Sequence, residues 1–121
     1  MSAAAARIRE LNDAFRRKGP TWATLLGIVQ PDEDGWFITD GLNAFGPAFS
    51  LEAVRAAQVF DSFTGDNDPH REHDFGAFEL AGQRLFWKID YYDLDLRYGS
   101  EDPANPGITR RIITIMLASE Y

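Results

Sequence analysis

The sequence predicts a single α+β domain, in which an antiparallel sheet of about four to five strands carries two helices packed mainly on one face. Three observations support this fold class: apolar residues at helical spacing near the N-terminus, an alternating pattern between residues 72 and 93, and an Ile- and Thr-rich segment at the C-terminus. The chain has 121 residues, of which 45% are apolar. That is enough for one core, so we expect residues 1–121 to form one domain.

The first predicted helix covers Ala3–Lys18. Its apolar residues Ile8, Leu11 and Phe15 recur at i, i+3 and i+7 and form a narrow stripe. Three basic residues in the last turn suit the negative end of the helix dipole, and a Gly-Pro pair follows. We therefore expect this helix to lie across the surface of the core.

The next segment predicts two strands joined by a turn. The range Trp22–Gln30 is rich in apolar and β-branched residues, the sequence PDEDG at residues 31–35 is typical of a turn, and Trp36–Thr39 is the returning strand. The range Asp40–Phe49 contains two glycines and a proline, and we expect it to be irregular.

A second helix is predicted over Leu51–Phe60. Ser50 is expected to cap its N-terminus, and Leu51, Val54 and Gln58 are expected to line one side of it. An acidic loop, 61–74, then leads to the hairpin.

The hairpin extends over Phe75–Tyr91 and contributes most of the aromatic core. We expect one buried face to carry these side chains from both strands: Phe78, Leu80, Leu85, Trp87, Ile89 and Tyr91. A turn at Ala81-Gly82 pairs Phe78 with Leu85, whereas a turn at Gly82-Gln83 pairs Phe78 with Trp87. Both registers leave the same side chains on the same face.

A second acidic loop, 93–107, precedes the last element. The range Ile108–Ala118 has four Ile and two Thr residues and predicts a strand that is apolar on both faces, as an inner strand is. A C-terminal helix capped by Thr109 is the alternative.

Composition restricts the function classes. No apolar run is long enough to span a bilayer, and the chain has no cysteine for a disulfide, a thiolate nucleophile or a Cys-type zinc site. A cytoplasmic location is expected. Residues 31–102 hold sixteen Asp or Glu against five Arg or Lys within a chain of net charge −7. Direct nucleic-acid binding is therefore not expected, because phosphate binding needs a basic surface.

The acidic surface suits a basic protein partner instead, and solubility alone is the simpler explanation of the same charge. The candidate partner-binding residues lie in or beside the two acidic loops: Asp66, Asp68, Glu72, Asp93, Asp95, Glu101 and Asp102. The oligomeric state stays open.

Two alternatives involve chemistry. The spacing Asp66-x-Asp68-x-His70-x-Glu72 places possible metal ligands at every second position, although it does not match a Ca²⁺ loop. No organic cofactor is expected, and a divalent metal ion is the one alternative that this spacing leaves open. A metal-dependent enzyme, for example a hydrolase, would use His73, Asp74, Lys88 and Asp90, because the two ends of a hairpin lie side by side. A structural subunit of a larger complex is the third class.

Four segments together resemble one known family: EHDFGAFEL, FWKIDYYD, LRYGSEDPANP and ITIMLASEY. The family consists of small alphaproteobacterial proteins, often carried on plasmids and classed as a domain of unknown function. The match covers residues 50–121 and the N-terminal helix, whereas the insertion PDEDG departs from the family pattern. Carriage on mobile elements implies roles such as anti-restriction, anti-CRISPR or plasmid maintenance. The expected function is therefore a non-catalytic interaction protein, acting as an inhibitor of a basic or nucleic-acid-binding host protein.

Overall fold

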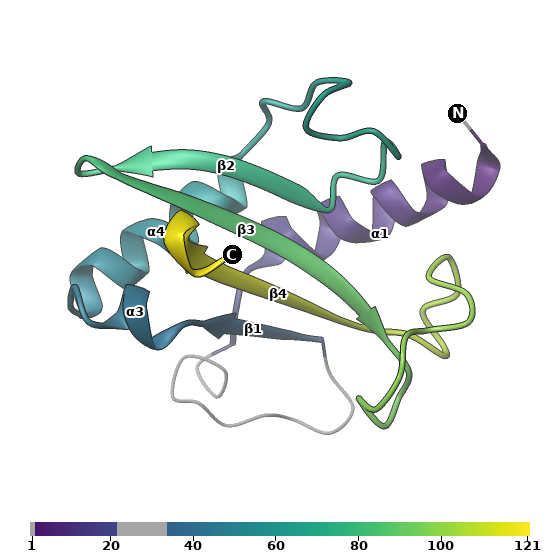
Figure 1. Cartoon of the computed structure of the whole chain (residues 1–121). Coiled ribbons are helices and arrows are strands. Elements are labelled where there is room, and N and C mark those ends of the chain that lie inside the picture. Colours follow the sequence, from purple (N-terminus) through teal and green to yellow (C-terminus); the bar gives the residue numbers. More distant parts are fainter. Residues whose placement is uncertain (1, 22–33) are drawn as a thin grey trace.

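The structure is a computed structural model and describes residues 2–21 and 34–121. The strand predicted at Trp22–Gln30 and most of the turn after it lie outside the described residues. Within the described ranges, four strands form one sheet in the order β1-β4-β3-β2 (Figure 1). The strands are β1 (Gly35–Ile38), β2 (Phe75–Leu80), β3 (Gln83–Tyr92) and β4 (Arg110–Leu117). With the helices packed against this sheet, the predicted α+β fold is confirmed.

The C-terminal segment is a strand and not a helix. Strand β4 lies between β3, to which it is antiparallel, and β1, to which it is parallel, so the sheet is mixed but mostly antiparallel. Ile113 and Ile115 are completely buried on one face, whereas Ile112 and Thr114 on the other face are partly exposed. The prediction of an inner strand at Ile108–Ala118 is correct in position and in type.

The hairpin adopts the first of the two predicted registers. Phe78 lies opposite Leu85, which places the turn at Ala81-Gly82. Both turn residues have positive φ angles, 50° and 79°, which match the right-handed twist of the strands in a two-residue hairpin. The face carrying Leu85, Trp87 and Ile89 is buried, as predicted.

Helix α1 (Ala3–Lys18) has the predicted bounds, and the Ser2 side chain accepts a hydrogen bond from Ala5 N at its start. Its buried stripe differs from the predicted one. Ile8 is buried, but the other two buried residues of the helix are polar: Asn12 and Arg16, both completely enclosed. Arg16 therefore does not serve as a solvated charge at the helix C-terminus.

The segment predicted to be irregular contains two helix starts. Helix α3 (Asp40–Asn43) begins after Thr39, whose side chain accepts a hydrogen bond from Leu42 N. Helix α4 (Pro47–Val59) begins four residues earlier than predicted. Its N-cap is Gly46, with φ 102°, and proline is well suited to the first helical position because it needs no N–H partner there.

Two further expectations for α4 are therefore wrong. Ser50 is not the N-cap but lies inside the helix, where its hydroxyl donates to Asn43 Oδ1 at 3.0 Å. Leu51 does not face the core and is 56% exposed, because the earlier start rotates the buried face onto Ser50, Ala53, Val54 and Ala57.

Helices α1 and α4 pack on the same face of the sheet, as predicted. Figure 1 shows both behind the strands, and the core between them includes Val54, Ala57, Trp87, Ile113 and Ile115, with Phe15 packed against it. The short 3-10 helix η1 (Ala118–Glu120) lies in front, and Tyr121 beyond it contacts Phe75 and Phe86 on the opposite face.

Candidate functional site

The sheet separates the four residues of the predicted catalytic set. Lys88 and Asp90 alternate with the buried residues of β3, so they face away from the helices, and Lys88 Nζ lies 2.9 Å from Asp90 Oδ2. That contact also raises the pKa of Lys88. Asp74 falls on the helix-side face by the same alternation, and His73 contacts helix α1. The hairpin thus brings its two ends together but places these two pairs on opposite faces.

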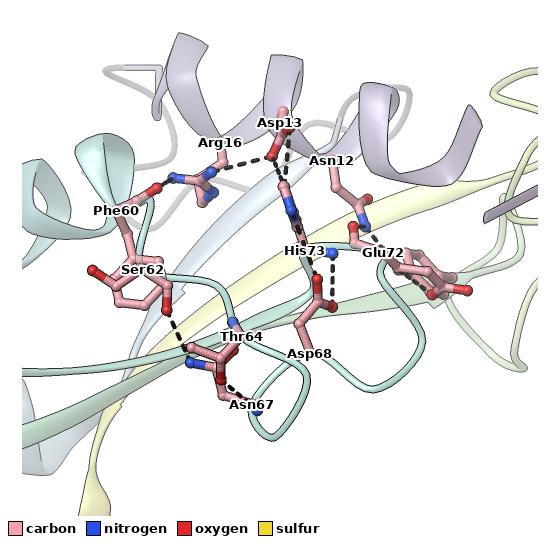
Figure 2. A network of polar contacts seen from close by, with 11 residues as sticks. Asn12, Asp13, Arg16, Phe60, Ser62, Thr64, Asn67, Asp68, Glu72 and His73 are labelled. Carbon is pink, nitrogen blue, oxygen red and sulfur yellow. Dashed lines mark hydrogen bonds and ion pairs between the residues drawn. The ribbon is translucent and has the colours of Figure 1, made fainter. Parts of the chain in front are cut away.

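His73 is held by two aspartates on the helix side (Figure 2). Its Nδ1 lies 2.9 Å from Asp13 Oδ1, and its Nε2 lies 3.7 Å from Asp68 Oδ2. The His73 backbone N donates to the other oxygen of Asp68 at 3.1 Å, and the Phe63 ring stacks on the imidazole at a centroid distance of 3.7 Å. This group of contacts joins helix α1 to the 61–74 loop.

Arg16 joins the same group to the end of helix α4. Its Nη1 donates to three backbone carbonyls, those of Ala57, Gln58 and Phe60, at 2.8–3.1 Å. Its Nη2 lies 3.2 Å from Asp13 Oδ1, and its guanidinium lies 4.9 Å from the centre of the Trp87 ring. Burial lowers the pKa of Arg16, and the hydrogen bond that Arg16 donates to Asp13 opposes that shift. The guanidinium thus donates to carbonyls at and just beyond the C-terminal end of α4, where the helix supplies few N–H donors.

A second chain of hydrogen bonds begins at Asn12. The amide Nδ2 donates to the carbonyl of Glu72 at 2.9 Å and to the Tyr91 hydroxyl at 2.8 Å. The Tyr91 hydroxyl donates to Glu72 Oε1 at 2.9 Å, and Arg111 Nε donates to Asn12 Oδ1 at 2.7 Å. Burial raises the pKa of Tyr91, so this side chain stays a neutral phenol that can donate. Burial also lowers the pKa of Arg111.

These contacts are those of a structural network. Each polar side chain described above has protein partners, and the network joins α1, the 61–74 loop, β3 and β4. A hollow of about 340 Å³ lies elsewhere, beside the C-terminal end of α1, and includes Phe15, Lys18, Asp34 and Trp36 in its lining. None of its described lining residues belongs to the predicted catalytic set. Within residues 2–21 and 34–121, no three His, Cys, Asp or Glu side chains gather closely enough to hold a metal ion.

The seven predicted partner-binding residues divide by exposure. Four of them are exposed: Asp66, Asp95, Glu101 and Asp102. Glu72 and Asp93 are half-buried. Glu72 accepts from Tyr91, and Asp93 accepts from two backbone N–H groups of its own loop. Asp68 is 4% exposed and holds His73, so it is not available to a partner on the surface.

More basic than acidic side chains are buried among the described residues. Three arginines lie in the interior with exposed fractions of 4% or less: Arg16, Arg110 and Arg111. Among the described acidic residues, Asp68 is the one that is buried. Among the described residues, the charged groups that stay on the surface are therefore more acidic on balance than all the charged groups taken together.

A comparison with protein families identifies the chain's relatives. The model of the family described as "Protein of unknown function (DUF3768)" matches residues 38–120. The chain belongs to the DUF3768 family. The match confirms the resemblance to a family of unknown function. Searches of the curated proteins and of the solved structures found no match.

The DUF3768 match begins at the last residue of β1 and contains α3, α4 and the strands β2 to β4. Helix α1 precedes it. The polar network thus joins side chains on both sides of the boundary: Asn12, Asp13 and Arg16 come from outside the matched region, whereas His73, Tyr91 and Arg111 come from within it. In the part of the chain that the structure describes, no helix is both long and apolar enough to cross a membrane.

Sequence reasoning missed the residues of α1 that build the network. Asn12 and Arg16 follow Ile8 at intervals of four, so all three lie on one face of the helix. The spacing from Ile8 alone, without regard to the polarity of the residues, would have indicated that Asn12 and Arg16 are buried. Asp13 carries no comparable signal, since an acidic residue at the edge of a helix stripe is normally solvated.

Proposed function

We propose that this DUF3768 protein is a non-catalytic interaction protein that offers an acidic surface to a basic protein partner. The surface includes four exposed carboxylates of the 61–74 and 93–102 loops: Asp66, Asp95, Glu101 and Asp102. The observation that carries the proposal is the uneven burial of charge, which withdraws three arginines from the surface and leaves these four carboxylates on it. Complementary charge of this kind speeds encounter with a basic partner and selects it over neutral ones.

The partner that fits best is a protein whose own ligand is a nucleic acid. Such a protein has a basic surface built to contact phosphates. Carboxylates spaced along two loops present the same sign of charge, so this chain would compete with the nucleic acid and act as an inhibitor. This part of the proposal follows the role that the resemblance to an often plasmid-borne family implies.

The alternative of a metal-dependent enzyme has less support. His73 and Asp74 lie on one side of the sheet, whereas Lys88 and Asp90 contact each other on the other side. His73 is also enclosed between Asp13 and Asp68. Because no observation brings the four groups to one reacting atom, the interaction protein is the function that the geometry supports best.

The proposal is tested with charge-reversal variants and salt. The partner is first isolated on the wild-type chain from its host, and its affinity is then measured at rising salt concentration for wild type and for Asp66→Lys and Glu101→Lys. We expect the affinity to fall steeply with salt and each variant to bind at least about tenfold more weakly. Both positions are exposed, so neither change should affect folding.

The matched control is Glu79→Lys. Glu79 is also exposed but lies near the turn of the hairpin, away from both acidic loops, and its reversal changes the net charge by the same amount. If the partner binds the Glu79→Lys variant as weakly as the Asp66→Lys and Glu101→Lys variants, binding depends on net charge alone and not on the acidic loops. Affinity that is insensitive to salt would refute the proposal.

A further inference from the structure

Helix α4 carries apolar side chains on its solvent side as well as on its core side. The residues that face outward along it are Ala48, Leu51, Glu52, Arg55 and Val59. At 100° per residue these positions fall within one sector about 100° wide, opposite the buried Ser50, Ala53, Val54 and Ala57. Leu51 is 56% exposed and Val59 is 72% exposed, so this outward stripe leaves two large apolar side chains in water.

A second apolar feature lies beside the start of this stripe. Phe45, which is 47% exposed, stacks on Phe49 with ring centroids 4.9 Å apart. Single exposed apolar residues are ordinary, but several along one helix face and its flank are typical of a surface that another protein covers.

The charges in the stripe indicate what covers it. Glu52 and Arg55 are both exposed, and neither takes part in an ion pair or side-chain hydrogen bond recorded for the described residues. When two copies of one helix pack antiparallel about a two-fold axis, residue i of one copy faces residue j of the other, and j faces i. An axis midway between Glu52 and Arg55 makes each Glu52 face Arg55 of the second copy.

The same axis also matches the apolar residues. It places Ala48 opposite Val59 of the second copy, so a small side chain faces a larger one twice across the interface. The stripe is therefore complementary to itself in both charge and size at one single register.

We propose that the protein forms a two-fold symmetric dimer through the outward stripe of helix α4. The inference is independent of the proposed function, since neither acidic loop contributes to the stripe. Helix α4 and the 93–107 loop lie at opposite ends of the sheet (Figure 1). Dimerisation therefore leaves the acidic 93–102 loop of each copy free, and the dimer presents two such loops to partners.

The test is the dependence of mass on concentration, measured by sedimentation for the whole chain. Because one helix from each copy makes a small interface, we expect a reversible equilibrium between 13.6 kDa and twice that mass. Glu52→Arg and Arg55→Glu each place like charges opposite each other, and each should weaken the dimer at least about tenfold. The double variant Glu52→Arg/Arg55→Glu restores the pairing and should regain most of the wild-type affinity.

Two further variants separate the stripe from general surface effects. Val59→Lys should leave the chain monomeric, whereas Leu94→Glu, at an apolar residue that is 53% exposed in the 93–107 loop, should dimerise like the wild type. Circular dichroism confirms that each variant is folded. A wild-type chain that is monomeric at every concentration overturns the proposal, and so does a dimer that the single charge variants leave intact or that the double variant fails to restore.

Discussion

His73 and Asp13 lie sixty residues apart in the sequence, and His73 Nδ1 approaches Asp13 Oδ1 to 2.9 Å. The same carboxylate oxygen lies 3.2 Å from Arg16 Nη2. Asp13 therefore connects the 61–74 loop, through His73, to the C-terminal end of α4, through Arg16. One half-buried side chain thus stabilises the packing of three separate segments.

Replacing Asp13 tests that connection. Asp13→Ala should lower the free energy of unfolding by about 2 kcal/mol, because it leaves the buried Arg16 without its acidic partner and removes one of the two aspartates that hold His73. Glu10→Ala is the matched control, since Glu10 forms an exposed ion pair with Arg7 that is worth about 0.5 kcal/mol or less. Urea unfolding of the two variants measures the difference, and similar losses would show that Asp13 has no special role.

Arg16 and Arg17 are adjacent in the sequence, but the side chain of Arg16 is buried and that of Arg17 is exposed. Arg16→Ala removes a completely buried side chain that donates to three backbone carbonyls, so we expect a loss of about 3 kcal/mol in the free energy of unfolding. Arg17 is exposed, and Arg17→Ala should stay within about 0.5 kcal/mol of the wild type. The melting temperatures of the two variants, compared with that of the wild type, measure this difference. A stable Arg16→Ala variant would contradict the structural role of the network.

Gly76 has no room for a side chain. A Cβ atom there would lie 2.3 Å from Trp87 Nε1 and 2.9 Å from Phe60 Cε1, and both rings belong to the packed core. We expect Gly76→Ala to cost about 2 kcal/mol or more in the free energy of unfolding, because the core must shift to admit the methyl group. Gly65→Ala is the control, with no atom within 4 Å of its added Cβ. Equal stability of the two variants, measured by chemical denaturation, would refute this account.

Asp74 makes stability depend on pH. Burial raises its pKa, and the neighbouring Glu72 raises it further. A carboxyl group with a raised pKa in the folded state favours folding when it is protonated, below its unfolded pKa of about 3.8. That contribution is lost as pH rises through the folded pKa, above which the ionised group opposes folding.

We therefore expect Asp74→Asn to be more stable than the wild type at neutral pH, with the advantage shrinking as the solution is acidified. Urea unfolding at a series of pH values measures this gap. Asp66→Asn, at an exposed position, should show no such gap. An Asp74→Asn variant that is less stable than the wild type at neutral pH would show that the Asp74 carboxylate is satisfied by contacts stronger than its desolvation.

Local patterns predicted the elements whose residues repeat with a clear period. Helix α1 has the predicted bounds, and the buried face of β3 alternates as expected at Leu85, Trp87 and Ile89. The start of α4 was placed wrongly, because a Gly-Pro pair normally indicates a turn. Here Gly46 is the cap and Pro47 the first helical residue, and the sequence pattern does not distinguish these two uses.

The candidate site was predicted less well for a related reason. His73 and Asp74 were identified, but their expected neighbours Lys88 and Asp90 lie on the other face, since a hairpin brings residues together along its length and still separates them by the alternation of its strands. The actual neighbour of His73 is Asp13, which comes from a distant helix. No local pattern predicts which residues of a helix will meet a loop sixty positions away.

By itself, therefore, the sequence determined the α+β class, the hairpin and the acidic balance of the chain, because periodicity, turn chemistry and charge are local properties that can be counted along it. Only the tertiary structure decided that β1 pairs in parallel with β4, that three arginines are buried while five of the loop carboxylates stay exposed, and that α4 turns Leu51 and Val59 toward solvent. Each of these depends on which surfaces of distant elements exclude water from one another, and that is a property of packing in three dimensions.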